Sequence, residues 1–221
     1  MMDASLARTM ICAMGRKLLE TGLVAGTWGN ISVRIDADHM AITPTGEDYM
    51  RMAPSDVPEV CITDGSFTGK KPSSEWKLHA AIYAERPEVN AVIHTHSMSA
   101  STVAATRRDV PPILDDLAQI VGPGVRCAPY ALPSTKKIVR VTMKALRGRN
   151  AALLANHGAV CVGRDLEEAF TCCQVLEKGC RAFIEAEFLG GAKPLGKIEA
   201  GLMHQFYLKK YAPRAGAQDD V

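Results

Sequence analysis

Two histidines close a run of apolar residues in the segment Ala91-Val92-Ile93-His94-Thr95-His96. Its β-branched residues favour a strand, in which alternate side chains point to the same face of the sheet. We therefore expect His94 and His96 to face the same way, close enough to bind one metal ion. Two ligands do not complete a catalytic zinc site, so the rest of the chain must supply at least one more.

His157 is the candidate third ligand, because it follows the apolar stretch 151–154 as His96 follows its own strand. Both would then reach the same edge of a sheet. Glu75, at the start of a predicted helix, is a candidate fourth ligand or general base. Three histidines with one open position describe a catalytic zinc site, and a nearby carboxylate suits proton transfer. The alternative is that the histidines are ordinary core or surface residues. That alternative is the simpler interpretation for the other three, His39, His79 and His204.

Three short segments rich in glycine and hydroxyl residues offer N–H and O–H donors to an anion. The last of them stands at a predicted helix N-terminus, where unpaired amides and the helix dipole favour negative charge. Together they would bind a phosphate group without an arginine, although each alone is equally typical of a turn or a helix cap. The segments are Thr27-Trp28-Gly29-Asn30, Thr45-Gly46 and Ser73-Ser74.

The elements that must position these residues mix strands and helices along the whole chain. Alternating or continuous apolar runs predict strands at 31–35, 40–42, 60–62, 91–96, 127–131, 151–154 and 159–162. Helical spacing and capping residues predict helices at 6–19, from the segment 70–75 to 85, and at 98–106, 135–146, 166–187 and 198–211. No repeat or linker divides the chain. We therefore expect one α/β domain over residues 1–212 and a disordered tail over 213–221.

Composition excludes several classes of function. The chain has 221 residues, 47% of them hydrophobic, and a net charge of +2. It shows no dense basic stretch, which gives no support for a nucleic-acid partner. No apolar run approaches the roughly 18 residues of a membrane span, and the N-terminus does not read as a signal peptide. Seven cysteines, an odd number without a C-x-x-C pair, favour reduced thiols in a cytoplasmic protein.

Taken together, the motifs resemble the class II aldolase/adducin family in their order and approximate spacing, from about residue 6 to residue 211. The resemblance is closest to the fuculose-phosphate aldolase-like zinc aldolases of that family. It implies a three-layer αβα fold around a largely antiparallel sheet, a Zn²⁺ site, and a homotetramer with active sites at subunit interfaces. The motifs that carry it are Gly29-Asn30-Ile31-Ser32-Val33-Arg34, Ile42-Thr43-Pro44-Thr45-Gly46, Pro72-Ser73-Ser74-Glu75, His94-Thr95-His96 and Asn156-His157-Gly158.

Carried over position by position, the resemblance also implies roles for single residues. His94, His96 and His157 match the family's zinc ligands. Glu75 matches its acid/base, which also ligates zinc when no substrate is bound. The non-catalytic adducin branch has lost its metal ligands, and because all are present here we expect an enzyme. The positions that match the phosphate site are Asn30, Thr45, Gly46, Ser73 and Ser74, with Thr27 and Gly29 close by.

The implied activity is that of a class II, metal-dependent aldehyde-lyase that cleaves a (deoxy)ketose 1-phosphate to dihydroxyacetone phosphate and an aldehyde. Of two tyrosines in fuculose-phosphate aldolases, one is replaced here by Asp115 and the other is best matched by Tyr211. Asp115 or Asp116 is either a proton donor from a neighbouring subunit or part of a solvated or capping pair. L-fuculose, 5-deoxyribulose and methylthioribulose 1-phosphates therefore all remain open as substrates.

A sugar-phosphate epimerase, or a dehydratase or other lyase on the same metal site, is the alternative activity. The epimerase branch uses an aspartate where Gln119 falls in this chain. It also uses a C-terminal tyrosine, and the tail beyond Pro213 contains none. Both departures count against epimerisation.

Overall fold

The computed structural model describes residues 2–210 of the chain, and eight of its segments are strands of one sheet. The strands are β1 (Asn30–Arg34), β2 (His39–Ile42), β3 (Glu59–Cys61), β4 (Phe67–Thr68), β5 (Ala91–Thr95), β6 (Arg126–Ala128), β7 (Ala151–Leu154) and β8 (Gly158–Gly163). Their order across the sheet is β4-β3-β2-β1-β5-β8-β7-β6. Every neighbouring pair is antiparallel except β6 and β7. The predicted largely antiparallel sheet is thereby confirmed.

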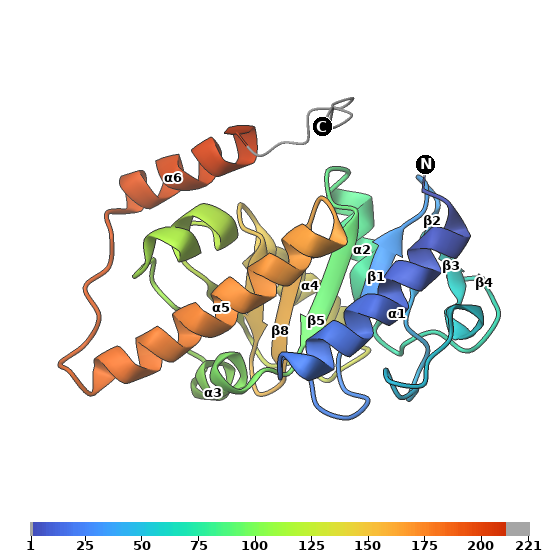
Figure 1. Cartoon of the computed structure of the whole chain (residues 1–221). Helices are drawn as coiled ribbons and strands as arrows, with labels where there is room; N and C mark the ends of the chain where they lie inside the picture. The colour runs from blue at the N-terminus through green and yellow to red at the C-terminus, as the bar shows by residue number, and fades with distance from the viewer. Residues whose placement is uncertain (1, 211–221) are drawn as a thin grey trace, which may run out of the picture.

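Helices cover both faces of this sheet, as Figure 1 shows. On one face lie α1 (Ala4–Glu20), α3 (Met98–Thr106) and α5 (Leu166–Glu187), and on the other lie α2 (Trp76–Glu85) and α4 (Lys136–Leu146). Because side chains alternate between the two faces of a strand, the sheet contributes apolar residues to two separate cores. In β5, Ile93 packs with the α1–α5 side and Val92 packs with the α2–α4 side. This burial on both faces is the physical basis of the predicted three-layer αβα fold, which is confirmed.

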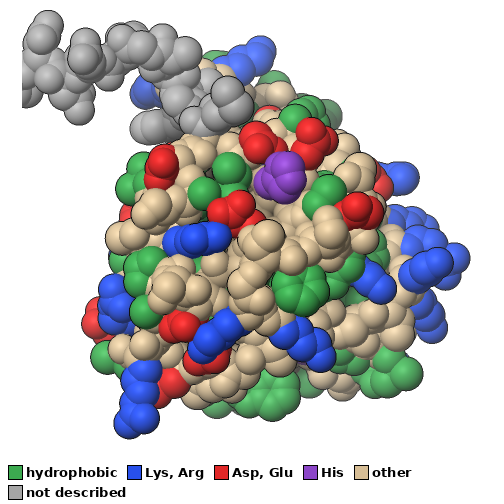
Figure 2. Space-filling view, turned by 90° about the vertical axis from the view of Figure 1, so that its right-hand side faces the viewer, with side chains coloured by type: hydrophobic (Ala, Val, Ile, Leu, Met, Phe, Trp, Pro, Cys, Tyr) green, Lys and Arg blue, Asp and Glu red, His purple; other side chains and the backbone are tan. Residues whose placement is uncertain are grey.

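Three further elements pack beside these helices. They are the short 3₁₀-helix η1 (Pro54–Asp56), the π-helix η2 (Leu117–Val121) and α6 (Lys197–Lys210). The helix η1 packs against α1, and η2 packs against α5. The helix α6 packs against η2, and His204 anchors it by a 2.7 Å bond from Nδ1 to the backbone oxygen of Gln119. On the face at the β4 edge of the sheet, Lys and Arg side chains lie among Asp and Glu side chains (Figure 2). Among the described residues, no helix is both long and apolar enough to cross a membrane.

Most element boundaries lie within two residues of the sequence-based expectation, and two differ by more. The helix expected from the segment 70–75 begins at Trp76, because Pro72 and Ser73 pair with another loop and a turn at Ser74 and Glu75 follows. Pro72 pairs with Pro44, and the Ser73 amide donates to the Thr43 oxygen at 3.0 Å. The strand expected at 127–131 is β6, which ends at Ala128 because Pro129 has no N–H to continue the ladder. Tail residues 213–221 lie outside the described residues.

Candidate active site

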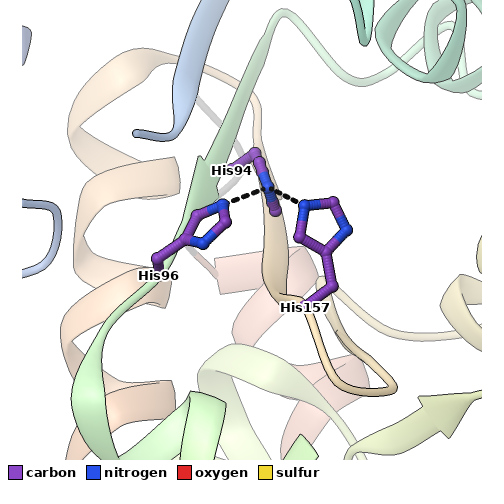
Figure 3. Close-up of side chains that lie close together, drawn as sticks. All are labelled: His94, His96 and His157. Carbon is purple, nitrogen blue, oxygen red and sulfur yellow. Dashed lines mark hydrogen bonds between the residues drawn. The ribbon is translucent and has the colours of Figure 1, made fainter. Parts of the chain in front are cut away.

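Three histidines meet at one edge of the sheet. His94 is on β5, His96 follows that strand directly, and His157 lies in the turn between β7 and β8. The β5–β8 register pairs Thr95 with Ala159, so this turn lies beside the end of β5. The Nε2 atom of His94 is 2.9 Å from Nε2 of His96 and 3.3 Å from Nε2 of His157 (Figure 3). Strand alternation therefore places the first two histidines together, and the turn adds the third.

The three rings turn their Nε2 atoms toward one another. Nδ1 of His94 donates to the Ala159 oxygen at 2.8 Å, so Nε2 is the ring nitrogen that faces the other two histidines. Burial lowers the pKa of His96 to about 3 and the pKa of His157 to about 4, so both rings are neutral near pH 7. A ring nitrogen carries either one lone pair or one hydrogen, so Nε2 of His94 cannot make a full hydrogen bond to both other rings. The ligand atoms of the three histidines lie within 4.8 Å of one another, an arrangement that suits a shared cation.

Glu75 adds a buried carboxylate to the three rings. Its Oε2 lies 3.2 Å from Nε2 of His94, and its Oε1 lies 3.8 Å from Nε2 of His157. Oε1 is buried without a hydrogen-bond partner among the described residues. Burial raises the pKa of Glu75, but the electrostatic attraction of the neighbouring His94 and His157 rings and a hydrogen bond from Asn30 outweigh it, so its pKa lies below the ordinary value. Three imidazoles and an ionised carboxylate form a donor set that fits zinc.

The seven residues predicted to bind phosphate line one cavity of about 250 Å³. Glu75, His96 and His157 line the same cavity, which is a size for a small molecule. Gly29 lets the first loop lie against β5: its φ is +86°, and a Cβ there would sit 2.6 Å from the His94 carbonyl oxygen. The other cavity residues are Trp28, Pro44 and Pro133, together with Thr27, Asn30, Thr45, Gly46, Ser73 and Ser74.

The seven residues differ in what they have left to offer an anion. The Thr45 hydroxyl donates to the Pro72 oxygen at 2.7 Å, and its amide donates to the Lys71 oxygen at 3.0 Å. Thr45 therefore ties two loops together, and its hydroxyl hydrogen is already used. Ser74 is exposed, and its hydroxyl has no hydrogen bond to a described residue. The Asn30 amide is bonded to Glu75, which leaves one N–H of that group for a ligand.

Of the other two predicted catalytic residues, Asp115 does not join this cluster. Asp115 is exposed just before η2 and does not line the cavity of its own chain. Tyr211 lies outside the described residues. The seven cysteines are all free, and burial raises the pKa of Cys161 and Cys180 far from the range of a reactive thiol.

Sequence reasoning missed a set of buried polar residues behind the site. His79 bonds to both Asn30 and Ser32, and Ser32 bonds in turn to Tyr83. The spacing carries a signal that could have found them. Glu75, His79 and Tyr83 are four residues apart, which places them along one face of a helix. Asn30 and Ser32 are two apart and share one face of β1.

Comparisons with known proteins agree with this geometry. The sequence model of a family described as "Class II Aldolase and Adducin N-terminal domain" matches residues 9–184. The 5-deoxy-D-ribulose 1-phosphate aldolase of Bacillus thuringiensis is 34% identical over 87% of this chain and 91% of that protein. A 5-methylthioribulose-1-phosphate/5-deoxyribulose-1-phosphate aldolase of Rhodospirillum rubrum is 39% identical over 70% of this chain and 69% of that protein. A solved structure of an L-fuculose 1-phosphate aldolase superposes with a TM-score of 0.88 and 34% identity, covering 93% of this chain and 98% of that one.

Proposed function

The chain belongs to the class II aldolase and adducin family, and we propose that it is a zinc-dependent aldolase that cleaves a deoxyketose 1-phosphate. The products would be dihydroxyacetone phosphate and an aldehyde. One observation carries the proposal: the Nε2 atoms of His94, His96 and His157 converge beside the unpartnered Oε1 of Glu75. These groups lie on the wall of a cavity whose other walls are rich in donors for a phosphate.

In the proposed mechanism, zinc held by His94, His96 and His157 supplies a Lewis acid for the carbonyl end of the substrate. Glu75 is the acid/base and a ligand when no substrate is bound. When the C3–C4 bond breaks, the C4 hydroxyl loses its proton as the aldehyde forms, and C3 must gain a proton to complete dihydroxyacetone phosphate. The free Oε1 of Glu75 faces the site, so we assign both transfers to it: the carboxylate takes the proton of the C4 hydroxyl as the bond breaks and then delivers that proton to C3.

The phosphate of the substrate would bind in the loops around Ser74. Ser73, Ser74 and the backbone before α2 place donors at a helix N-terminus, where negative charge is favoured. Thr27, Gly29, Asn30 and Gly46 complete the cavity wall, and Thr45 holds the loops together. Because Glu75, His96 and His157 line the same cavity, a phosphate held by these loops would keep the bond to be broken next to the reacting groups.

Support for a deoxy substrate comes from the relatives and from the mouth of the site. Two of the three relatives described above carry 5-deoxyribulose 1-phosphate in their names. Trp28 is 66% exposed at the cavity wall, with its ring 5.5 Å from that of His96. An apolar ring at the mouth suits a sugar whose far end carries a methyl or methylthio group in place of a hydroxyl.

We further propose a cytoplasmic homotetramer in which Asp115 of one subunit approaches the cavity of the next. Asp115 is exposed and stands away from the cavity of its own chain, so only a neighbouring subunit gives it a role in catalysis. Tyr211 is retained as a second candidate for the aldehyde side. Trp28 and Leu132, exposed at 66% and 63%, give this end of the molecule apolar surface for such a contact. Seven free cysteines support a reducing compartment.

A panel of ketose 1-phosphates, assayed for release of dihydroxyacetone phosphate, tests the proposed function. The panel contains L-fuculose, 5-deoxyribulose and methylthioribulose 1-phosphates, each with and without a chelator. We expect chelator-sensitive release of dihydroxyacetone phosphate from at least one of them. Conversion of a substrate without that product, by epimerisation or by loss of water, would contradict the proposed reaction.

A further inference from the structure

A buried chain of hydrogen bonds runs from the core between β1 and α2 to the carboxylate of Glu75. Tyr83 bonds to Ser32 at 2.8 Å, Ser32 to His79 at 2.6 Å, His79 to Asn30 at 2.6 Å, and Asn30 to Glu75 at 2.9 Å. His79 and Ser32 are fully buried, and none of the five residues is more than 8% exposed. Burying this much polar surface is costly unless every group is bonded.

The chemistry of the groups fixes the direction of every bond in this chain. The ionised carboxylate of Glu75 only accepts, so Asn30 must turn its NH₂ toward Glu75 and its Oδ1 toward His79. Oδ1 also only accepts, so Nε2 of His79 must carry the proton. Burial lowers the pKa of His79 to about 3, so the ring is neutral and its Nδ1 is a bare acceptor.

The directions of the other two hydrogen bonds, at Ser32 and Tyr83, follow by the same reasoning. The Ser32 hydroxyl must donate its one hydrogen to Nδ1 of His79, so Ser32 accepts from Tyr83. Burial raises the pKa of Tyr83 well above its ordinary value, so the phenol keeps the hydrogen that it donates. All four hydrogen bonds therefore point toward Glu75. Bonds aligned in this way polarise one another and bring their positive ends to the carboxylate.

The two carboxylate oxygens of Glu75 differ in their hydrogen bonding. Oε2 is held by Asn30, whereas Oε1 has no hydrogen-bond partner among the described residues. We propose that His79, Ser32 and Tyr83 are positioning residues that act through Asn30. Their one-directional chain fixes one oxygen of Glu75 and leaves the other free to transfer protons. This inference rests on the proposed role of Glu75 as acid/base.

Two substitutions of His79 separate this role from a purely structural one. A glutamine amide reaches about as far as Nε2 of histidine, so His79→Gln keeps a donor to Asn30. An asparagine amide reaches only about as far as Nδ1, so His79→Asn loses that donor. We expect His79→Asn to lower kcat by about 10- to 100-fold with KM changed less than about 3-fold, and His79→Gln to stay within about 3-fold of wild type.

A double-mutant comparison tests whether the effect passes through Glu75. In a Glu75→Gln background, we expect His79→Asn to change the residual kcat by less than about 2-fold. A loss of the same size in both backgrounds would show that His79 acts on the fold and would overturn the proposal. Equal losses of kcat in the His79→Asn and His79→Gln variants would overturn it as well.

A milder variant tests the far end of the chain if substitutions at His79 prevent folding. Tyr83→Phe removes one buried hydroxyl, and we expect it to lower kcat about 2- to 5-fold while leaving KM unchanged. Thr142→Val is the matched control, because it removes a buried hydroxyl on α4 that has no partner in the described part of the chain. The same loss of kcat in both variants would contradict a directed chain.

Nitrogen NMR of wild-type protein with ¹⁵N-labelled histidine rings tests the direction of the chain without any assay of activity. We expect His79 to show a protonated Nε2 and a bare Nδ1, and competition with a chelator to show zinc bound more weakly by His79→Asn than by wild type. A protonated Nδ1, or unchanged zinc affinity, would overturn the proposal. If wild type cleaves no ketose 1-phosphate, the proposed function fails, while both of these measurements still test the chain.

Discussion

Oε2 of Glu75 lies 3.2 Å from Nε2 of His94, although the two residues belong to different elements of the fold. Glu75 is the residue before α2, and His94 is the fourth residue of β5. Asn30 on β1 connects the two residues. It pairs with His94 in the β1–β5 ladder, and its side chain donates a hydrogen bond to Glu75 at 2.9 Å. The carboxylate therefore stands next to the histidine cluster before any ligand binds.

Replacing Glu75 tests the proton transfer assigned to it. Glu75→Gln keeps the size of the side chain and removes its basicity, so we expect kcat to fall about 10²- to 10⁴-fold while the protein stays folded. Steady-state release of dihydroxyacetone phosphate measures this change. Glu85→Gln, at the exposed last residue of α2, is the control, and its kcat should match that of wild type. A Glu75→Gln enzyme with normal kcat would remove Glu75 from the mechanism.

Ser74 tests the phosphate loops, because its exposed hydroxyl is free to donate. A hydrogen bond to a charged group at an exposed site contributes on the order of 1 kcal/mol, so we expect Ser74→Ala to raise KM about 5-fold. The value of kcat should change little if the bond serves binding alone. The control is Ser5→Ala on α1, remote in sequence from the loops. An unchanged KM would place the phosphate elsewhere.

Gly29 tests the packing of the first loop against the metal strand. An alanine there would have φ near +86° and its Cβ 2.6 Å from the His94 carbonyl oxygen, so strain and clash act together. We expect Gly29→Ala to lower the free energy of unfolding by about 3 kcal/mol and to weaken zinc binding. Gly22→Ala has a similar positive φ with open space around it and should cost only about 1 kcal/mol. Urea denaturation measures the free energy of unfolding of both variants. Equal losses would show that Gly29 does not pack closely against the His94 carbonyl oxygen.

Burial of His79 predicts how the stability of the metal-free protein depends on pH. Its pKa is lowered to about 3 in the folded chain, whereas an unfolded histidine titrates near pH 6.5. Below about pH 6.5 the unfolded state binds a proton that the folded state does not. The free energy of unfolding then falls by about 1.4 kcal/mol per pH unit for this group, down toward pH 3.

Urea denaturation of chelator-treated protein between about pH 7 and pH 5 measures this term. His79→Gln removes the titrating group, so its stability should fall less steeply than that of wild type, by the equivalent of one proton. Parallel pH profiles for the two proteins would show that His79 is not held neutral by burial.

Much of the architecture could be predicted from the sequence, because periodicity reports directly which face of an element is buried. The helices at 98–106 and 166–187 have the predicted boundaries, and the second begins where the Asp165 side chain accepts from the Glu168 amide. The two-residue spacing of His94 and His96 was sufficient to place both rings together. The start of α2 was less predictable, because pairing between Pro72 and Pro44 decides it, and those residues are far apart in the sequence.

The parts of the site that could not be predicted depend on partners from distant elements. Thr45 looks like a phosphate donor in sequence, but its hydroxyl is used by the backbone of Pro72. His79 looks like a core histidine, and only the arrangement of β1 against α2 shows that it bonds to Asn30. The role of Asp115 depends on a second subunit, so neither the sequence nor the fold of one chain determines it.

Zinc reconstitution tests the central claim most directly. Chelator-treated wild type, the His94→Ala variant and the control His39→Ala, whose exposed ring bonds to Asp36, would each be titrated with zinc. The rate of dihydroxyacetone phosphate formation would be followed at each step. We expect wild type and His39→Ala to be inactive without metal and to regain activity in proportion to zinc, up to one ion per chain. His94→Ala should neither bind zinc nor regain activity. Full activity of metal-free wild type, or of zinc-free His94→Ala, would contradict the account.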